Sequence, residues 1–211
     1  MVGLAITDHG PAMGGHLASP FFDRLYDPLP GIRLLKGMEC NLLEEPGRID
    51  CPAQWLPFMD VVLLGIHANV PDGLGKTAYT DMLILAMENN PYVDIIVHPN
   101  ASAYELELEP IVQSALDNDM VIEINNSRCL PRLAHTESTR KLIDICARLN
   151  CPIVVSSDAH ALNEVGQDSM VRPLLAEARF PHELIVNLDA DRTFAFLEQR
   201  RPRKQNHRPA R

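Results

Sequence analysis

The segment Cys151-Pro-Ile-Val-Val-Ser-Ser-Asp-Ala-His160 decides the fold, because it joins a buried strand to two polar side chains. Residues 153–155 form an unbroken β-branched run, which is typical of a strand covered on both faces. Asp158 and His160 follow, and side chains at i and i+2 of an extended segment point the same way. A carboxylate and an imidazole are thus presented together, as in sites for divalent cations. Taken alone, such a pair is more often a turn or a capped loop.

Similar apolar runs recur along the chain and alternate with helical patterns. Strands are predicted at Val2–Thr7, from Ile32 to Asn41, and at Asp60–His67, Asp94–His98, Val121–Ile124 and 153–155. Helices are predicted near Phe22–Tyr26, at Thr80–Asn89, from Glu109, and at Ser138–Leu149, Gln167–Ala178 and Asp191–Gln199. This alternation predicts a parallel α/β fold with its active site at the carboxyl ends of the strands. Glycine-rich motifs of dinucleotide or nucleoside triphosphate sites are absent from the sequence.

Composition indicates one soluble domain. The chain has 211 residues, of which 46% are hydrophobic and 22% charged. Apolar runs stay well short of the roughly 20 residues that span a bilayer, so no membrane partner is expected. The five cysteines are odd in number and form no Cys-x-x-Cys motif, which favours reduced thiols and a cytoplasmic location.

Charge is distributed unevenly along the chain. The formal net charge is −9, but residues 199–211 contain six of the 19 basic residues and no acid. The remaining 13 basic and 28 acidic residues give the body a charge near −15. An acidic body argues against nucleic acid as a partner. We expect residues 1–198 to form the domain and residues 199–211 to be a disordered basic tail.

Metal-ligating residues stand at successive predicted strand ends. A lone histidine there is usually structural, but six such ligands on five strand ends predict a metal site. Histidine and carboxylate without cysteine suit zinc, manganese or iron in a hydrolytic site, in which Glu39 would bridge two cations. In chain order the strand ends carry His9, Glu39, His67, His98, Asn125 with Asn126, and Asp158 with His160.

These motifs resemble the PHP (polymerase and histidinol phosphatase) superfamily, and most closely its YcdX-type bacterial phosphatases. The resemblance runs from residue 3 to about residue 198, and its motifs occur in the family's order. The matching pieces are Ile-Thr-Asp-His-Gly-Pro (6–11), Gly-Met-Glu-Cys-Asn (37–41), Gly-Ile-His (65–67), Val-His-Pro (97–99), Glu-Ile-Asn-Asn-Ser (123–127) and Ser-Asp-Ala-His (157–160).

The resemblance implies a distorted (β/α)7 barrel that hydrolyses a small phosphorylated substrate with up to three zinc or manganese ions. It implies that Glu39 bridges two metals and that His67 and His98 complete one of these two sites. By the same resemblance, Asp158 belongs to the other bridged site. His9 and His160 would hold the third metal. Glu39, Asp158 and His160 are accordingly the expected catalytic residues.

The sequence departs from the family pattern at its start. The family begins with a strand bearing His-x-His and a helix, and this chain begins one β/α unit later. We therefore expect fewer than three metals, reduced activity, and an exposed edge on the strand Val2–Thr7. The metals served by Asp158 and His160 would lose ligands. His16 is interpreted as a loop histidine and not as a replacement ligand.

Several alternatives remain open at this point. Arg128 and Asn125 are candidate substrate-binding residues, although a surface arginine and a loop-capping asparagine fit the same positions. The chain could be a non-catalytic metal-binding or interaction domain, as the missing His-x-His favours. A PHP-type nuclease is disfavoured by the acidic body. An amidohydrolase-type barrel is a further alternative, but it would have a metal-bridging lysine where this chain has Glu39. The sequence is compatible with a homo-oligomer.

Overall fold

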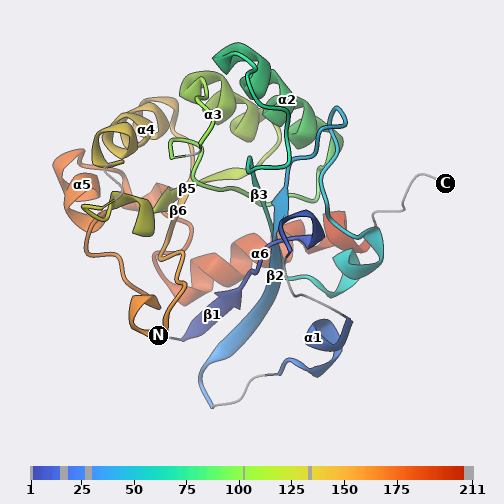
Figure 1. Ribbon diagram of the computed structural model, residues 1–211. Coiled ribbons are helices and arrows are strands. Elements are labelled where there is room, and N and C mark those ends of the chain that lie inside the picture. Colours follow the sequence, from blue (N-terminus) through green and yellow to red (C-terminus); the bar gives the residue numbers. More distant parts are fainter. Residues whose placement is uncertain (1, 15–18, 27–29, 102, 133–134, 207–211) are drawn as a thin grey trace.

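The computed structural model describes residues 2–14, 19–26, 30–101, 103–132 and 135–206. Six parallel strands form one curled sheet whose spatial order follows the chain (Figure 1). Because all strands run the same way, their carboxyl ends lie along one edge of the sheet. The predicted parallel α/β arrangement is confirmed. The strands are β1 (Gly3–Ile6), β2 (Arg33–Asn41), β3 (Val61–Gly65), β4 (Ile95–Ile96), β5 (Val121–Asn125) and β6 (Ile153–Ser156).

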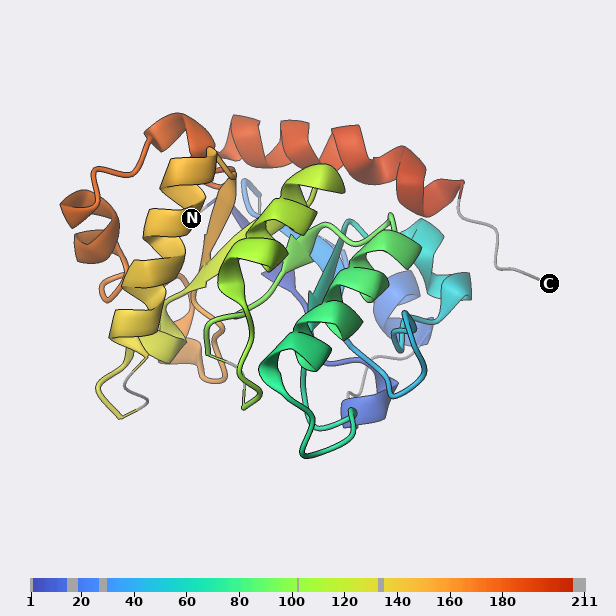
Figure 2. The ribbon, with the colours of Figure 1, turned by 90° about the horizontal axis from the view of Figure 1, so that it is seen from above.

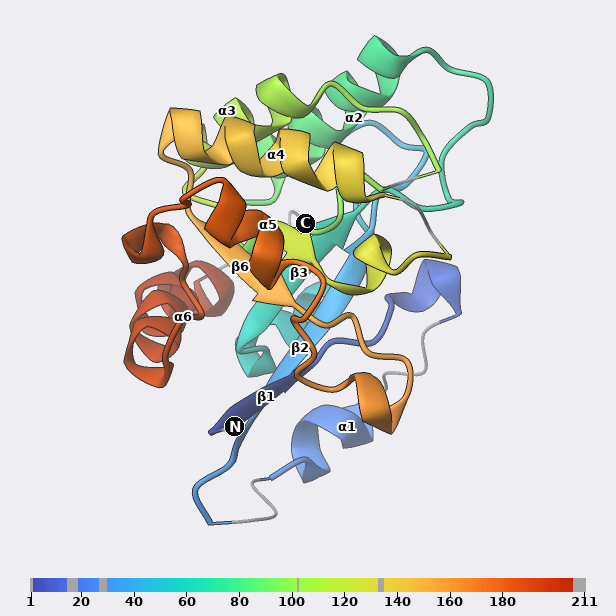
Figure 3. The same cartoon turned by 90° about the vertical axis from the view of Figure 1, so that its left-hand side faces the viewer.

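The sheet is a half-barrel, with β1 and β6 as its two edge strands. Figure 3 views it from the side on which these strands lie. The Asn187 side chain covers part of the β6 edge. Its Oδ1 accepts from Val155 N at 2.9 Å and its Nδ2 donates to Val155 O at 2.7 Å. One amide thereby replaces two hydrogen bonds that a further strand would make with β6.

Three helices cover the convex face and connect neighbouring strands, as parallel pairing requires. They are α2 (Lys76–Asn89), α3 (Leu108–Asp117) and α4 (Thr136–Leu149), and they lie side by side in chain order (Figures 1 and 2). Short helices α1 (Ser19–Arg24) and α5 (Arg172–Glu177) flank the sheet. The predicted helix over 167–178 is therefore shorter than expected. No helix in the described ranges has the length and apolarity to cross a membrane.

Alternation along the strands divides the core in two. The larger core fills the space between the convex face and the helices. The smaller core lies on the concave face and includes Leu197 from the last helix, α6 (Ala190–Gln205). Convex residues include Met38, Val62, Leu64, Ile96, Ile122 and Ile124. Concave residues are Leu35, Val61, Leu63 and Val97.

Helix α6 is tied to the amino ends of β4 and β5 by buried charges. Asp94 is fully buried and accepts from Arg200 Nε at 2.6 Å and from Lys204 Nζ at 2.7 and 2.9 Å. Its Oδ2 also accepts from Val62 N at 2.8 Å. Arg200 donates to the backbone oxygens of Val93 and Asp119. Every charge in this cluster has a partner, as burial demands.

This cluster corrects the expectation of a disordered tail beginning at residue 199. Residues 199–205 are the last turns of α6, and residues 207–211 lie outside the described part of the chain. The composition of this basic run predicts side chains exposed to solvent, but Arg200 and Lys204 are buried against Asp94. Pro202 within the run also disfavours a helix in any prediction from sequence.

We expect Asp94→Ala to lower the free energy of unfolding by about 3–5 kcal/mol, because it leaves two buried cations uncompensated. Urea denaturation followed by circular dichroism measures the change. Glu198→Ala is the matched control, since it removes an exposed ion pair with Arg201 on the same helix and costs under about 1 kcal/mol. Similar losses in both variants would contradict this account.

Candidate functional site

Three imidazoles from neighbouring strand ends converge on one carboxylate, that of Glu39. His98 Nε2 lies 3.0 Å from Glu39 Oε1 and forms a hydrogen bond with it. His67 Nε2 lies 3.1 Å from the same oxygen. The His67 ring packs edge-on against His9 and His98, with ring centroids 4.8 and 5.2 Å apart. Ligand atoms of His9, Glu39 and His67 all lie within 4.8 Å of one another.

Strand register explains why His9, Glu39 and His67 meet. His9 and Glu39 pair as a parallel bridge beyond the end of β1, with Glu39 N donating to Asp8 O and Gly10 N to Glu39 O. Leu63 packs into the concave core, and side chains two residues apart in a strand face the same side. Gly65 and His67 continue this alternation, so the His67 side chain also faces the concave side. Three of the predicted ligands therefore reach the site by simple alternation.

His98 reaches the site differently. Val97 packs into the concave core, so alternation would turn the next side chain to the convex face. The His98 backbone instead has φ of 31°, in the left-handed region that is uncommon outside glycine. Pro99 follows, and a residue before proline normally stays extended. This turn directs the His98 imidazole back toward Glu39.

Glu123 supports the site from β5, on its concave face. Its Oε2 accepts from His98 N at 2.7 Å and from Asn125 Nδ2 at 3.2 Å. Its Oε1 accepts from Ser156 Oγ at 2.5 Å. The carboxylate thus joins the ends of β4, β5 and β6. Sequence reasoning missed this residue, although its spacing of two from Asn125 places both side chains on one face.

Burial and mutual contact perturb these groups. Burial raises the pKa of Glu39, but the imidazoles of His67 and His98 outweigh it and hold that pKa well below its usual range. Burial lowers the pKa of His67 despite the Glu39 carboxylate. Burial also opposes the charged form of His98, yet the carboxylates of Glu39 and Glu123 raise its pKa. Burial raises the pKa of Glu123.

The remaining predicted residues fall into two groups. Asp158 lies beside Asn125, whose Nδ2 donates to Asp158 Oδ2 at 3.1 Å, and Arg128 Nε lies 3.6 Å from that oxygen. Arg128 N also donates to Asn125 Oδ1. His160 is 72% exposed in its side chain and stands apart from the Glu39 cluster, with Nδ1 near the Asp158 backbone oxygen.

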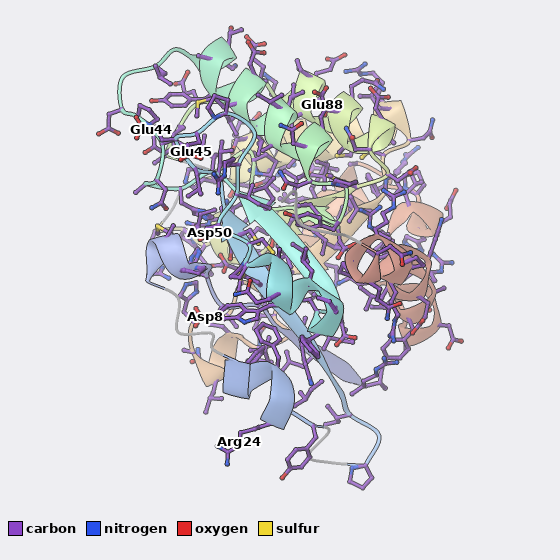
Figure 4. All side chains as sticks on the ribbon, turned by 90° about the vertical axis from the view of Figure 1, so that its right-hand side faces the viewer. Asp8, Arg24, Glu44, Glu45, Asp50 and Glu88 are labelled. Carbon is purple, nitrogen blue, oxygen red and sulfur yellow. The ribbon has the colours of Figure 1, made fainter. Side chains whose placement is uncertain are left out.

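Asn126 has a structural contact, because its side chain accepts from Met170 N at 2.8 Å. Asp50 is a further residue that the sequence did not single out. Its carboxylate accepts from Ala12 N and from the backbone and side chain of Asn41, fixing the loops after β1 and β2. Figure 4 shows Asp50 and Asp8 on this side of the molecule. The predicted loop residue His16 lies outside the described residues.

A cavity of about 1510 Å³ opens between the edge strands β1 and β6. Its wall includes His9, Glu39, Asp158 and His160, so these four side chains face a space large enough for a small molecule. Other parts of the wall are apolar, with side chains such as Leu63 and Val154. The arrangement thus combines a polar cluster with an apolar pocket.

Comparisons with known proteins identify bacterial relatives. The chain is 33% identical to a probable phosphatase of Acetivibrio thermocellus over 202 residues, covering 94% of the chain and 83% of the relative. It is 34% identical to a probable phosphatase of Caldicellulosiruptor bescii, with coverage of 93% and 82%. A probable phosphatase of Caldanaerobacter subterraneus is 31% identical, with coverage of 95% and 80%. No family model matches the chain.

Among solved structures, the chain resembles one from a cryo-EM structure of archaeal ribonuclease P with mature tRNA. The TM-score is 0.60 and the match covers 95% of this chain and 82% of that chain. The sequence identity is 12%, so this likeness concerns the fold alone.

Gly65 sets the space available to His67, and its substitution tests the geometry of the cluster. A Cβ at residue 65 would lie 2.6 Å from His67 Cε1 and 2.8 Å from Val97 Cγ2. We expect Gly65→Ala to displace the His67 ring and to cost about 1–3 kcal/mol in unfolding free energy. Histidine ring resonances in NMR spectra and urea denaturation measure both effects.

Gly75→Ala is the matched control for this substitution, because nothing lies within 4 Å of its added Cβ. It should leave the ring resonances of His67 unchanged. An unshifted His67 ring in Gly65→Ala would show that the strand end has more room than the structure indicates.

Proposed function

The chain belongs to the family of these bacterial probable phosphatases, and on this premise we propose that it is a metal-dependent phosphoesterase of the PHP superfamily. The observation that carries the proposal is the convergence of three imidazoles on the partly buried Glu39 carboxylate. An acidic group and histidines without cysteine form a donor set suited to zinc or manganese.

Buried imidazole nitrogens without hydrogen-bond partners support the proposal that these residues bind a cation. Within the described chain, Nε2 of His67 and the Nδ1 atoms of His9, His67 and His98 are buried and have no hydrogen-bond partner. Buried polar atoms are normally paired, so unpartnered ones at a single cluster call for an explanation. A cation held by His9, Glu39 and His67, with His98 beside it, would pair with such atoms at His9 and His67.

Divalent cations held here would supply Lewis acidity, lowering the pKa of a water molecule and withdrawing charge from phosphate oxygens. The protein's own groups have separate tasks. The low pKa of Glu39 keeps its carboxylate ionised and available as a ligand across the physiological range. The partly buried guanidinium of Arg128 would bind a phosphate oxygen, and the Asn125 amide would fix Asp158 beside it.

Asp158 and His160 are proposed as ligands of further cations, as the family resemblance implies. Asp158 faces the cavity from the end of β6, and His160 reaches the same wall from the following loop. The open side of the half-barrel between β1 and β6 is where a complete (β/α)7 barrel would have another strand. The proposed substrate is a small phosphorylated molecule bound in the cavity beside these groups.

Metal analysis combined with a phosphatase assay tests this proposal. We expect at least one zinc or manganese per chain and slow hydrolysis of para-nitrophenyl phosphate. Glu39→Ala should lower both metal content and rate. The rate should fall by more than about 100-fold, since even residues that only support ligands contribute about 10- to 100-fold. Glu45→Ala is the control, because Glu45 is exposed and pairs only with Arg48 among the described ion pairs.

Two results would count against the proposal. A metal content below one per chain, together with an unchanged hydrolysis rate in Glu39→Ala, would rule out the proposed metal site. Full metal loading without hydrolysis of any phosphate ester would instead support a non-catalytic metal-binding domain.

Arg128 provides a separate prediction about substrate. Arg128→Ala should raise KM for a phosphate ester about 10- to 100-fold, because a charge-assisted hydrogen bond to phosphate is lost. Metal content should stay the same. Arg132→Ala, an exposed arginine of the same loop, is the control and should leave KM unchanged. A KM insensitive to Arg128 would exclude it from phosphate binding.

A further inference from the structure

Glu123 lies on the wall of the same cavity and is buried, with 4% of the residue exposed. We propose that Glu123 is a positioning residue, whose carboxylate holds the His98 main chain so that the imidazole faces Glu39. The inference rests on the proposed function, because positioning matters only if His98 is a ligand.

The geometry at His98 requires such a partner. Val97 faces the concave core, so the chain must leave the extended conformation for the next side chain to reach Glu39. It does so with φ of 31° immediately before Pro99, a conformation that a histidine rarely adopts. Such strain persists only where the surroundings over-determine the conformation. Glu123 Oε2 supplies that constraint by accepting from His98 N at 2.7 Å.

The same carboxylate also acts on Asp158. Asn125 Nδ2 lies between the two acids, 3.2 Å from Glu123 Oε2 and 3.1 Å from Asp158 Oδ2. Asp158 has φ of 46°, a second left-handed backbone at a strand end. One buried group thus connects the two proposed ligand positions whose backbones depart from the extended conformation. Its other oxygen, held by Ser156 at 2.5 Å, fixes the carboxylate itself.

Zinc affinity and amide exchange together test this role. In Glu123→Ala, competition with a chromogenic chelator should show zinc affinity weakened by about 10- to 100-fold, the usual effect of removing a group that orients a ligand. In the metal-free protein, the His98 amide should exchange with solvent faster than in the wild type. Glu123→Gln should keep most of the affinity, because its carbonyl oxygen can accept from His98 while Ser156 reverses its hydroxyl.

Asn90→Ala separates positioning from a general loss of stability. Asn90 is buried and hydrogen-bonded to Gly47, Ala86 and Tyr92, away from the cluster. Its variant should lose stability but keep zinc affinity. Equal losses of affinity in Asn90→Ala and Glu123→Ala would overturn the proposal, as would unchanged affinity and exchange in Glu123→Ala.

Two outcomes need a further measurement: a Glu123→Ala variant that does not fold, and a wild type that binds no zinc. If Glu123→Ala does not fold, Glu123→Asp replaces it, since it keeps the charge but shortens the reach to His98 and Ser156. If the wild type binds no zinc, the proposed function fails, and the His98 amide exchange still reports whether Glu123 holds that backbone.

Discussion

The buried ion cluster around Asp94 is the constraint on which the rest of the structure depends. It ties the last helix of the chain to the amino ends of two central strands, more than 100 residues earlier in the sequence. Because α6 also places Leu197 in the concave core, the same contact covers one end of the half-barrel. The opposite edge of the sheet, at the carboxyl ends of the strands, does not take part in this ion cluster. Stability and chemistry therefore occupy opposite edges of one sheet.

The chemistry at the carboxyl edge follows from alternation, with one exception. Glu39 and His67 reach the concave side because they lie an even number of residues after the concave core residues Leu35 and Leu63. His9 joins them because it pairs with Glu39 across a parallel bridge. His98 does not follow this spacing, and a left-handed backbone corrects the mismatch. The site is therefore assembled by regular geometry at three positions and by a local departure at the fourth. At this departure His98 N donates one hydrogen bond to Glu123 of the neighbouring strand β5.

This difference explains what the sequence could and could not predict. Strand order, and the meeting of His9, Glu39 and His67, follow from local patterns and from parallel pairing. The role of Glu123 and the burial of Lys204 depend on contacts between distant segments, so no local pattern reveals them. The basic run at residues 199–205 is the clearest case. Its charge suggests solvent exposure, whereas Asp94 supplies a partner 106 residues before Arg200. His160 lies at the predicted strand end, but its exposed position is set by the loop that follows.

The site also shows a tension between stability and function. Four imidazole nitrogens of His9, His67 and His98 are buried without hydrogen-bond partners within the described chain, and two of the proposed ligands, His98 and Asp158, have left-handed backbones. Each feature disfavours the folded state, because unpaired buried polar groups and strained residues both raise its free energy. A fold under no functional constraint would replace these groups with apolar ones. The cation proposed at Glu39 would compensate for the unpaired nitrogens, because it would bind the folded state and not the unfolded one.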